Sequence, residues 1–147
     1  MPSLLNDEVK KQIQEVFVEL KEPVQILFFG TQQECQFCED TQQLVEEVSS
    51  LSDLLQVNTF DVDADASIAE AYNIELTPSL VIAGEGEDGP IDFGIRYAGI
   101  PSGYEFGALI QDLLMVSGRD SGLQANTREF LAELTEPLHL RVFATPT

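Results

Sequence analysis

The chain has 147 residues, and its 26 acidic residues against seven basic ones give a formal net charge of −19. Such an acidic surface repels phosphate backbones and anionic lipid headgroups, which argues against nucleic-acid and membrane partners. No apolar run approaches the ~20 residues that a membrane-spanning helix needs, and the first residues show no secretory signal pattern. With 44% hydrophobic residues the chain can bury a core, and its length favours one domain.

The first part of the chain predicts helices alternating with strands. Apolar residues spaced three and four apart indicate an amphipathic helix over 7–20, which Glu22-Pro23 ends. The β-branched and aromatic run 24–29 is typical of a buried strand. A polar turn then leads to a second helix over 35–51, and alternating polar and apolar residues predict a second strand over 56–62.

The next part predicts a short helix, a hairpin and a longer helix. Asp61 and Asp63 follow the second strand, and we expect them to cap the helix after it; a proton-relay role is the alternative. The remaining predicted elements are a helix over 66–72, a strand over 79–82, a turn over 84–90, a strand over 92–97 and a helix over 104–117. Alternation followed by a hairpin predicts an α/β fold: a mixed four-stranded sheet with helices on both faces.

The end of the chain repeats its beginning. Residues 129–147 align with residues 15–33 without a gap, and seven of 19 positions are identical. Both copies contain a helix end, Glu-Pro, a strand and a threonine. We therefore expect a complete unit over 1–118, a linker over 119–126, and the first helix and strand of a truncated second unit over 127–147. A coincidental likeness is the alternative.

The strand predicted over 138–144 would lack most of its own sheet. Unpaired strands seek partners. We expect this strand to pair with the sheet edge of the same unit, or with another chain in a homodimer.

The two cysteines, Cys35 and Cys38, form a Cys-Gln-Phe-Cys motif after a predicted strand. A secreted disulfide framework usually has more cysteines, spread more widely. A structural zinc site wants four ligands, and the single histidine, His139, lies far along the chain. The motif therefore favours a redox-active dithiol. A metal shared with another chain and an incidental pair are the alternatives.

The order of these motifs resembles the thioredoxin superfamily. The strand over 24–29, the Cys35–Cys38 motif opening a helix, and Thr77-Pro78 before a strand form its layout. The stretches 92–97 and 142–147 are similar to the N-terminal unit of the two-unit protein disulfide oxidoreductases, which are glutaredoxin-like proteins of thermophilic archaea and bacteria. The resemblance implies a thioredoxin-like fold with an extra N-terminal helix, and dithiol–disulfide exchange with protein or peptide substrates. It also implies a cytoplasmic setting.

Each cysteine has an expected role. Cys35 is expected to be the nucleophile, because a helix N-terminus stabilises a thiolate. Cys38, one turn further and more buried, is expected to resolve the mixed disulfide. Acidic neighbours at Glu34, Glu39 and Asp40 work against the thiolate, so we expect a less depressed pKa at Cys35 than in strongly oxidising relatives.

The resemblance also implies substrate-binding residues. Pro78 would be a cis-proline facing the thiols, and Thr77 would offer backbone groups to an extended peptide; a plain turn is the alternative. Phe37 is expected to tune the cysteine pair and to contact substrate. Thioredoxins carry a buried aspartate six residues before the first cysteine. That position is Phe29 here, so the group that accepts the proton of Cys38 is undefined.

Three functions compete on these features. The first is a thiol–disulfide oxidoreductase without a cofactor, served by a thioredoxin-reductase-like flavoprotein as electron donor. The second is a non-catalytic peptide-binding module that supports a second catalytic unit. The third is a glutathione-dependent glutaredoxin, which is disfavoured because glutathione is anionic and no Gly-Gly-Asp stretch follows Gly84.

Overall fold

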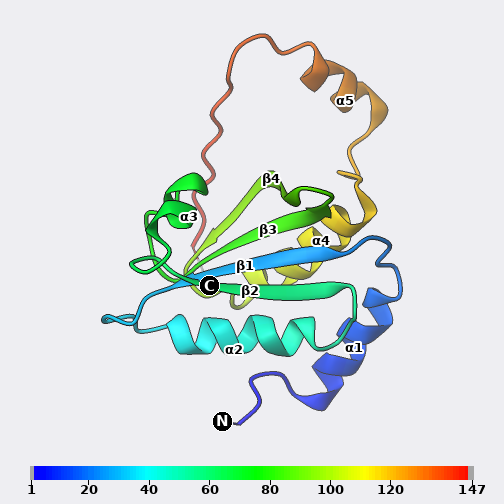
Figure 1. Ribbon diagram of the computed structural model, residues 1–147. Helices are drawn as coiled ribbons and strands as arrows, with labels where there is room; N and C mark the ends of the chain where they lie inside the picture. The colour runs from blue at the N-terminus through cyan, green and yellow to red at the C-terminus, as the bar shows by residue number, and fades with distance from the viewer. Residues whose placement is uncertain (1, 146–147) are drawn as a thin grey trace.

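The computed structural model describes residues 2–145 and contains a mixed four-stranded sheet in the order β2-β1-β3-β4 (Figure 1). The central strand β1 (Val24–Gly30) pairs in parallel with β2 (Leu55–Asp61) and antiparallel with β3 (Ser79–Gly86). The edge strand β4 (Gly89–Ala98) completes a hairpin with β3. The predicted α/β architecture is confirmed.

Helices cover the two faces of the sheet unequally. They are α1 (Asp7–Phe17), α2 (Cys38–Ser49), α3 (Ala66–Ala71), α4 (Tyr104–Gly118) and α5 (Ala125–Ala132). Helices α1, α2 and α4 contribute buried residues to one large core on one face, whereas only α3 packs on the other face. The fold therefore has a thick layer on the face that carries α2, where the cysteines lie.

Side chains of β1 alternate between these two cores, although every residue of the strand is buried. Ile26 and Phe28 belong to the large core with Cys38. Leu27 and Phe29 belong to the smaller core under α3, where the ring of Phe29 stacks on that of Phe60 with 5.1 Å between centroids. This alternation decides which side chains of β1 can approach the cysteines.

Several element boundaries differ from the sequence prediction. Helix α2 begins at Cys38, with Phe37 as its N-cap, so Cys35 lies in the turn before the helix rather than in its first turn. The hairpin strands extend into the predicted turn, because ladder pairing continues to Gly86 and Gly89. Asp65 is the N-cap of α3 but makes no side-chain cap hydrogen bond; its carboxylate instead accepts from the backbone N–H of Asp61 at 3.0 Å.

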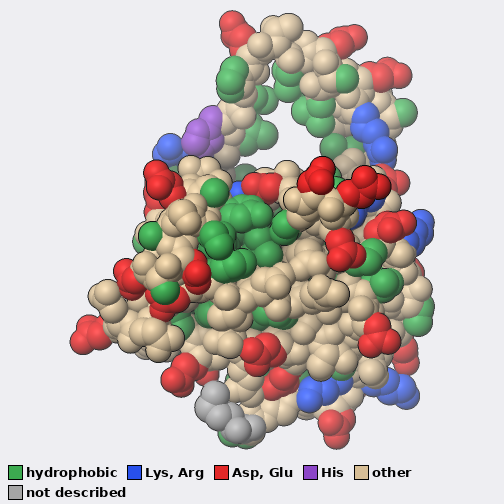
Figure 2. All heavy atoms as spheres, viewed as in Figure 1, with side chains coloured by type: hydrophobic (Ala, Val, Ile, Leu, Met, Phe, Trp, Pro, Cys, Tyr) green, Lys and Arg blue, Asp and Glu red, His purple; other side chains and the backbone are tan. Residues whose placement is uncertain are grey.

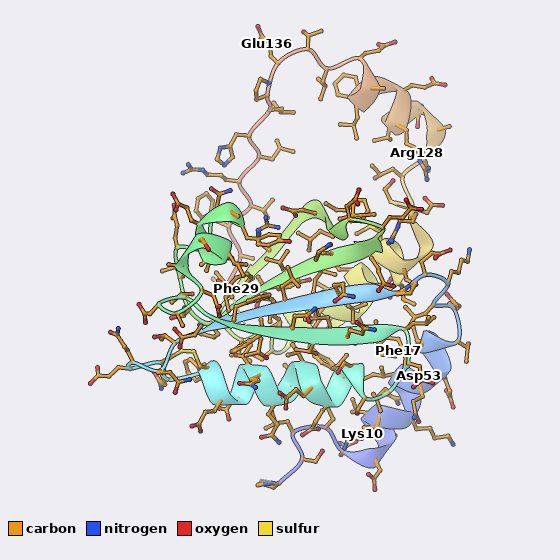
Figure 3. All side chains as sticks on the ribbon, in the orientation of Figure 1. Lys10, Phe17, Phe29, Asp53, Arg128 and Glu136 are labelled. Carbon is orange, nitrogen blue, oxygen red and sulfur yellow. A yellow bond between two sulfur atoms is a disulfide. The ribbon has the colours of Figure 1, made fainter. Side chains whose placement is uncertain are left out.

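The predicted strand over 138–144 does not form within the described residues. Residues 119–145, which we call the arch, run from the end of α4 through α5 away from the sheet and then back towards it, with Glu136 at the far end (Figures 1 and 3). Because the segment lies alongside neither edge of the sheet, its N–H and C=O groups find no ladder partner. The expected pairing with the sheet edge of the same unit is therefore wrong. Pro146 and Thr147 of the similar stretch 142–147 lie outside the described residues.

Residues 119–145 are all exposed, and many of them are apolar. The side chains of Leu140, Val142 and Phe143 are 79%, 92% and 87% exposed. Figure 2 shows hydrophobic side chains along the inner side of the arch and in the middle of the visible face below it, with acidic side chains around them. The arch therefore adds nothing to the two cores.

Candidate functional site

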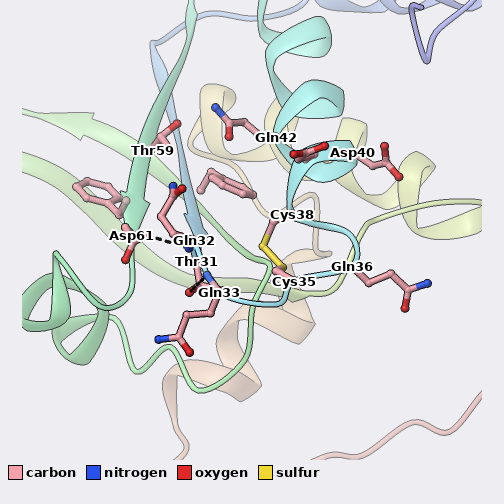
Figure 4. Close-up of a pocket in the computed structure, with 14 residues that line it drawn as sticks. Thr31, Gln32, Gln33, Cys35, Gln36, Cys38, Asp40, Gln42, Thr59 and Asp61 are labelled. Atoms are coloured by element: carbon pink, nitrogen blue, oxygen red, sulfur yellow. Dashed lines mark hydrogen bonds between the residues drawn. A yellow bond between two sulfur atoms is a disulfide. The ribbon is translucent and has the colours of Figure 1, made fainter. Parts of the chain in front are cut away.

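Cys35 and Cys38 form a disulfide at the N-terminal end of α2, with their Cα atoms 5.5 Å apart (Figure 4). The side chain of Cys38 is buried in the large core, whereas Cys35 is half-buried. The predicted difference in burial is confirmed. The first intrahelical hydrogen bond runs from Thr41 N–H to Phe37 C=O. The N–H groups of the preceding helical residues have no helical acceptor and point towards the turn that carries Cys35.

A cavity of about 680 Å³ opens beside the disulfide. It lies between the start of α2, the loop before Cys35 and the C-terminal end of β2 (Figure 4). Both cysteines line it, and its other walls are mainly amides, hydroxyls and carboxylates. These polar residues are Thr31, Gln32, Gln33, Gln36, Glu39, Asp40, Gln42, Thr59 and Asp61. The disulfide is thus reached from a polar, open side.

Gly30 allows β1 to pass close to the buried sulfur. A Cβ on Gly30 would lie 3.5 Å from the Sγ atom of Cys38, and 2.8 and 2.9 Å from atoms of the Phe28 ring. Real Cβ atoms do not approach other atoms closer than about 3.0 Å. A glycine at the end of an otherwise apolar strand is the sequence signal for such a close approach, and we did not single it out from the sequence.

The position that carries a buried aspartate in thioredoxins points away from the cysteines here. Phe29 occupies it and packs under α3, on the opposite face of the sheet from Cys38. The carboxylates that share the cavity with the disulfide are Glu39, Asp40 and Asp61. Any proton exchange with Cys38 through this cavity therefore involves solvent and these groups.

Thr77 and Pro78 do not line the cavity. Their peptide bond is cis. The antiparallel register pairs Phe29 with Ser79, so one residue further Pro78 stands across from Gly30. Pro78 is buried and its C=O accepts a hydrogen bond from Gly99. Half-buried Thr77 makes no hydrogen bond within residues 2–145.

Phe37 is the third predicted substrate-binding residue. Its side chain is 43% exposed, beside the disulfide in sequence but outside the cavity lining. Its C=O accepts from both the N–H and the hydroxyl of buried Thr41. The backbone at Phe37 is thus fixed while its ring is left accessible.

Two aspartates connect the loop before Cys35 to the turn after β2. Asp61 accepts a hydrogen bond from the N–H of Gln32, and Asp63 accepts one from the hydroxyl of Thr31. The N–H groups of Ala64 and Asp63, and then that of Gln32, hold the pKa of the Asp61 carboxyl below its usual value. The sequence predicted helix capping for these residues; the structure shows a link between two loops instead.

Metal centres and membrane-spanning helices are absent from the described part of the chain. No group of three or more His, Cys, Asp or Glu residues within 2–145 is arranged to hold a metal ion. No helix among the same residues is long and apolar enough to cross a bilayer.

Comparisons with known proteins agree with this geometry. No family model matches the chain. It is 33% identical over 105 residues to an NADH dehydrogenase of Ferdinandcohnia aciditolerans, which covers 71% of this chain and 17% of that protein. It is 26% identical over 145 residues to the F component of the alkyl hydroperoxide reductase of Staphylococcus epidermidis, which covers 98% of this chain and 25% of the relative. The chain thus spans a quarter or less of the length of these curated relatives.

Among solved structures, the chain is similar to a protein disulfide oxidoreductase from Aeropyrum pernix. The two superpose with a TM-score of 0.77 at 26% sequence identity, over 88% of this chain and 55% of the other. The similarity therefore extends beyond the sheet to most of the chain, and the other protein is longer.

Proposed function

Because this chain is an N-terminal-type unit of the thioredoxin superfamily, we propose that it is a thiol–disulfide oxidoreductase unit acting on protein or peptide disulfides. One observation carries the proposal: a Cys-x-x-Cys disulfide beside a polar cavity, whose first cysteine is half-buried while its second is buried in the core. An accessible nucleophile and a sheltered partner suit a two-step exchange.

The proposed reaction begins with reduced cysteines. The Cys35 thiolate attacks one sulfur of the substrate disulfide, forms a mixed disulfide and releases the other substrate sulfur as a thiolate. The Cys38 thiolate then attacks Cys35, forms the Cys35–Cys38 bond and releases the second substrate thiolate. Two electrons pass to the substrate, and the two cysteine protons pass to solvent or to the released thiolates. The protein ends in the disulfide form.

The reduced pair must be restored by a donor. We propose a thioredoxin-reductase-like flavoprotein in the cytoplasm, in line with the similarity to a relative named as a component of alkyl hydroperoxide reductase. Reduction of the purified disulfide by such a flavoprotein with NADH or NADPH tests the donor. A disulfide that small thiols reduce but the flavoprotein does not would argue against this donor.

Substrate would bind on the Thr77 side of the disulfide. The backbone N–H and C=O of Thr77 are unused within residues 2–145, next to a buried Pro78. An extended peptide can pair with such groups as an added strand, which reads backbone rather than sequence. The exposed ring of Phe37 supplies an apolar contact beside the cysteines.

Two cysteine variants test the function. Cys35→Ser is expected to abolish reduction of insulin disulfides, because it removes the attacking sulfur. Cys38→Ser is expected to keep the first step and to accumulate a Cys35–substrate adduct, visible as a mass increase that dithiothreitol removes. Each variant is the matched control of the other. Insulin reduction that survives Cys35→Ser would refute the proposal.

A peptide-binding module without catalysis is the second candidate, favoured by the unused backbone of Thr77. It predicts that Cys35→Ser still binds an unfolded peptide with unchanged affinity while chemistry depends on another unit. Both candidates bind the peptide, so insulin reduction by Cys35→Ser separates them: the module predicts unchanged activity, and the oxidoreductase predicts its loss. A requirement for glutathione in turnover would point instead to a glutaredoxin-type reaction.

We also propose the division into a redox unit over 1–118, a linker over 119–126 and the start of a second unit over 127–147. The uniform exposure of residues 119–145 supports it, since none of them belongs to the cores of the first unit. The exposed apolar residues of the arch would be covered by the rest of such a unit, or by a second copy in a homodimer. Light scattering distinguishes a dimer from a monomer.

A further inference from the structure

The loop that presents Cys35 has no apolar anchor. Thr31 at its start is half-buried, and Gln32, Gln33 and Glu34 are exposed. Nothing in this stretch packs into either core. The conformation of the loop therefore depends on polar contacts.

One carboxylate ties this loop to the turn after β2. The Oδ2 atom of Asp61 accepts from the N–H of Gln32 at 3.2 Å (Figure 4). Its Oδ1 atom accepts from the N–H of Asp63 at 2.9 Å and from that of Ala64 at 3.1 Å. The N–H groups of the turn fix the carboxylate through Oδ1, and Oδ2 is then available to hold the loop at Gln32.

Neighbouring contacts reinforce the same link. The Oδ2 atom of Asp63 accepts from the Thr31 hydroxyl at 3.0 Å and from the Gln33 side-chain amide at 3.2 Å. The C=O of Gly30 accepts from the N–H of Val62 at 2.9 Å. The turn after β2 thus holds four successive residues of the chain that leads to Cys35, from Gly30 to Gln33.

We propose that Asp61 is a positioning residue for the second step of exchange, in which Cys38 attacks Cys35. This inference rests on the proposed function. In the oxidised protein the disulfide itself joins the loop to α2. Once Cys35 carries substrate, that covalent link is absent, and the contacts of the loop determine how far Cys35 stands from Cys38.

Holding the loop raises the effective concentration of the Cys35 sulfur at Cys38. The Cys35–Cys38 bond then forms and the bond from Cys35 to substrate breaks, with the substrate sulfur leaving as a thiolate. The first step depends on the loop much less, because the substrate arrives from solution. Asp61 should therefore affect the two steps differently.

The variant Asp61→Asn isolates the loop contact. An amide has one oxygen, so it cannot accept from both the turn and the Gln32 N–H. Asp65→Asn is the matched control, because Asp65 lies in the same turn and its carboxylate accepts only from the N–H of Asp61. Asp53→Asn removes a charge at the other end of α2 (Figure 3). Asp61→Ser is a second variant, in case the amide disturbs the turn.

The reduced proteins are mixed with a limiting amount of an aromatic disulfide, dithiobis(nitrobenzoate), whose thiolate absorbs when released. The first phase reports attack by Cys35, and the second reports ring closure by Cys38. In Asp61→Asn and Asp61→Ser we expect an unchanged first phase and a second phase about threefold to tenfold slower. Both controls should keep both rates. Circular dichroism and the thermal midpoint verify the fold of each variant.

An unchanged second phase in folded Asp61 variants would overturn the inference. So would an equal slowing in Asp65→Asn, because the charge of the turn rather than the loop contact would then be responsible. A parent protein with no first phase would refute the proposed function itself. The two failures are therefore distinguishable.

Discussion

The ring of Phe28 occupies the space that a side chain on Gly30 would need: a Cβ there would lie 2.8 Å from the Cε1 atom of Phe28. Phe28 is itself 2% exposed, so its ring cannot move into solvent. Gly30→Ala should therefore force a shift in the core beside Cys38. We expect a loss of about 1 to 3 kcal/mol in the free energy of unfolding, measured by urea denaturation of the oxidised protein.

Gly107→Ala is the control for this substitution. A Cβ at Gly107 meets no atom within 4 Å, and the residue lies inside α4. Alanine is the better helix former, so this variant should gain about 0.5 to 1 kcal/mol. Equal stability of Gly30→Ala and the parent would show that the Phe28 ring yields freely.

Glu47 makes the attachment of the N-terminal segment to α2 sensitive to acid. Partial burial by itself raises the pKa of this carboxyl, but hydrogen bonds outweigh it and hold the pKa at about 2. The donors are the Ser3 hydroxyl, the Gln43 amide and the N–H groups of Leu4 and Leu5. Because the pKa is lower in the folded state, this contribution is complete above about pH 4.5 and is lost as the pH falls towards about 2.

Glu47→Gln should remove most of that pH dependence. At neutral pH we expect the variant to be about 1 to 2 kcal/mol less stable than the parent, and the gap should close as the pH approaches about 2. Unfolding free energies measured across this acid range test the expectation. Glu46→Gln, on the same helix, is the charge-matched control. A gap that stayed constant with pH would contradict the role of the Glu47 carboxylate.

Ser117 joins the end of α4 to the chain between α1 and β1. Its fully buried Oγ atom accepts from the N–H of Lys21 at 2.8 Å and from that of Glu22 at 3.1 Å, and donates to the C=O of Glu22 at 2.7 Å. Ser117→Ala removes the partner of the Lys21 N–H and of the Glu22 C=O, while the Glu22 N–H keeps its bond to the Ser117 C=O. The loss should lower the free energy of unfolding by about 1 to 3 kcal/mol.

Ser49→Ala provides the comparison for Ser117. The hydroxyl of half-buried Ser49 bonds only to the C=O of Glu46 in its own helix. Its loss should change stability by less than about 0.5 kcal/mol. Thermal unfolding of the two variants together with the parent tests the difference. Similar midpoints for Ser117→Ala and Ser49→Ala would refute the assigned role of Ser117.

The arch should be dispensable for the first unit. Residues 119–145 are all exposed, and the ion pair from Arg128 to Asp120 lies on the surface. A chain ending at Gly122 keeps Arg119, whose guanidinium lies over the Phe93 ring. We expect it to unfold within about 0.5 kcal/mol of the parent and to resist aggregation better. A large loss of stability would show that the arch packs on the unit in solution.

Local patterns were sufficient for the elements and for the reactive pair. Apolar periodicity predicted α1, α2 and α4, and the β-branched run predicted β1, because both depend on neighbouring residues alone. The spacing of Cys35 and Cys38 allows a disulfide where the backbone turns, as it does before α2, where their Cα atoms are 5.5 Å apart. The predicted order of burial at the two cysteines is correct, although Cys35 lies before the helix and Cys38 is its first residue.

Contacts between segments that are distant in the sequence could not be predicted from local patterns. The face of β1 that meets Cys38 depends on which helices cover the sheet, and this directs Phe28 and Gly30 to the disulfide and Phe29 away from it. The link from Asp61 to Gln32 requires two loops to meet at the same end of the sheet. A strand pattern such as 138–144 becomes a strand only where a neighbour offers hydrogen bonds, and the tertiary structure places none beside it.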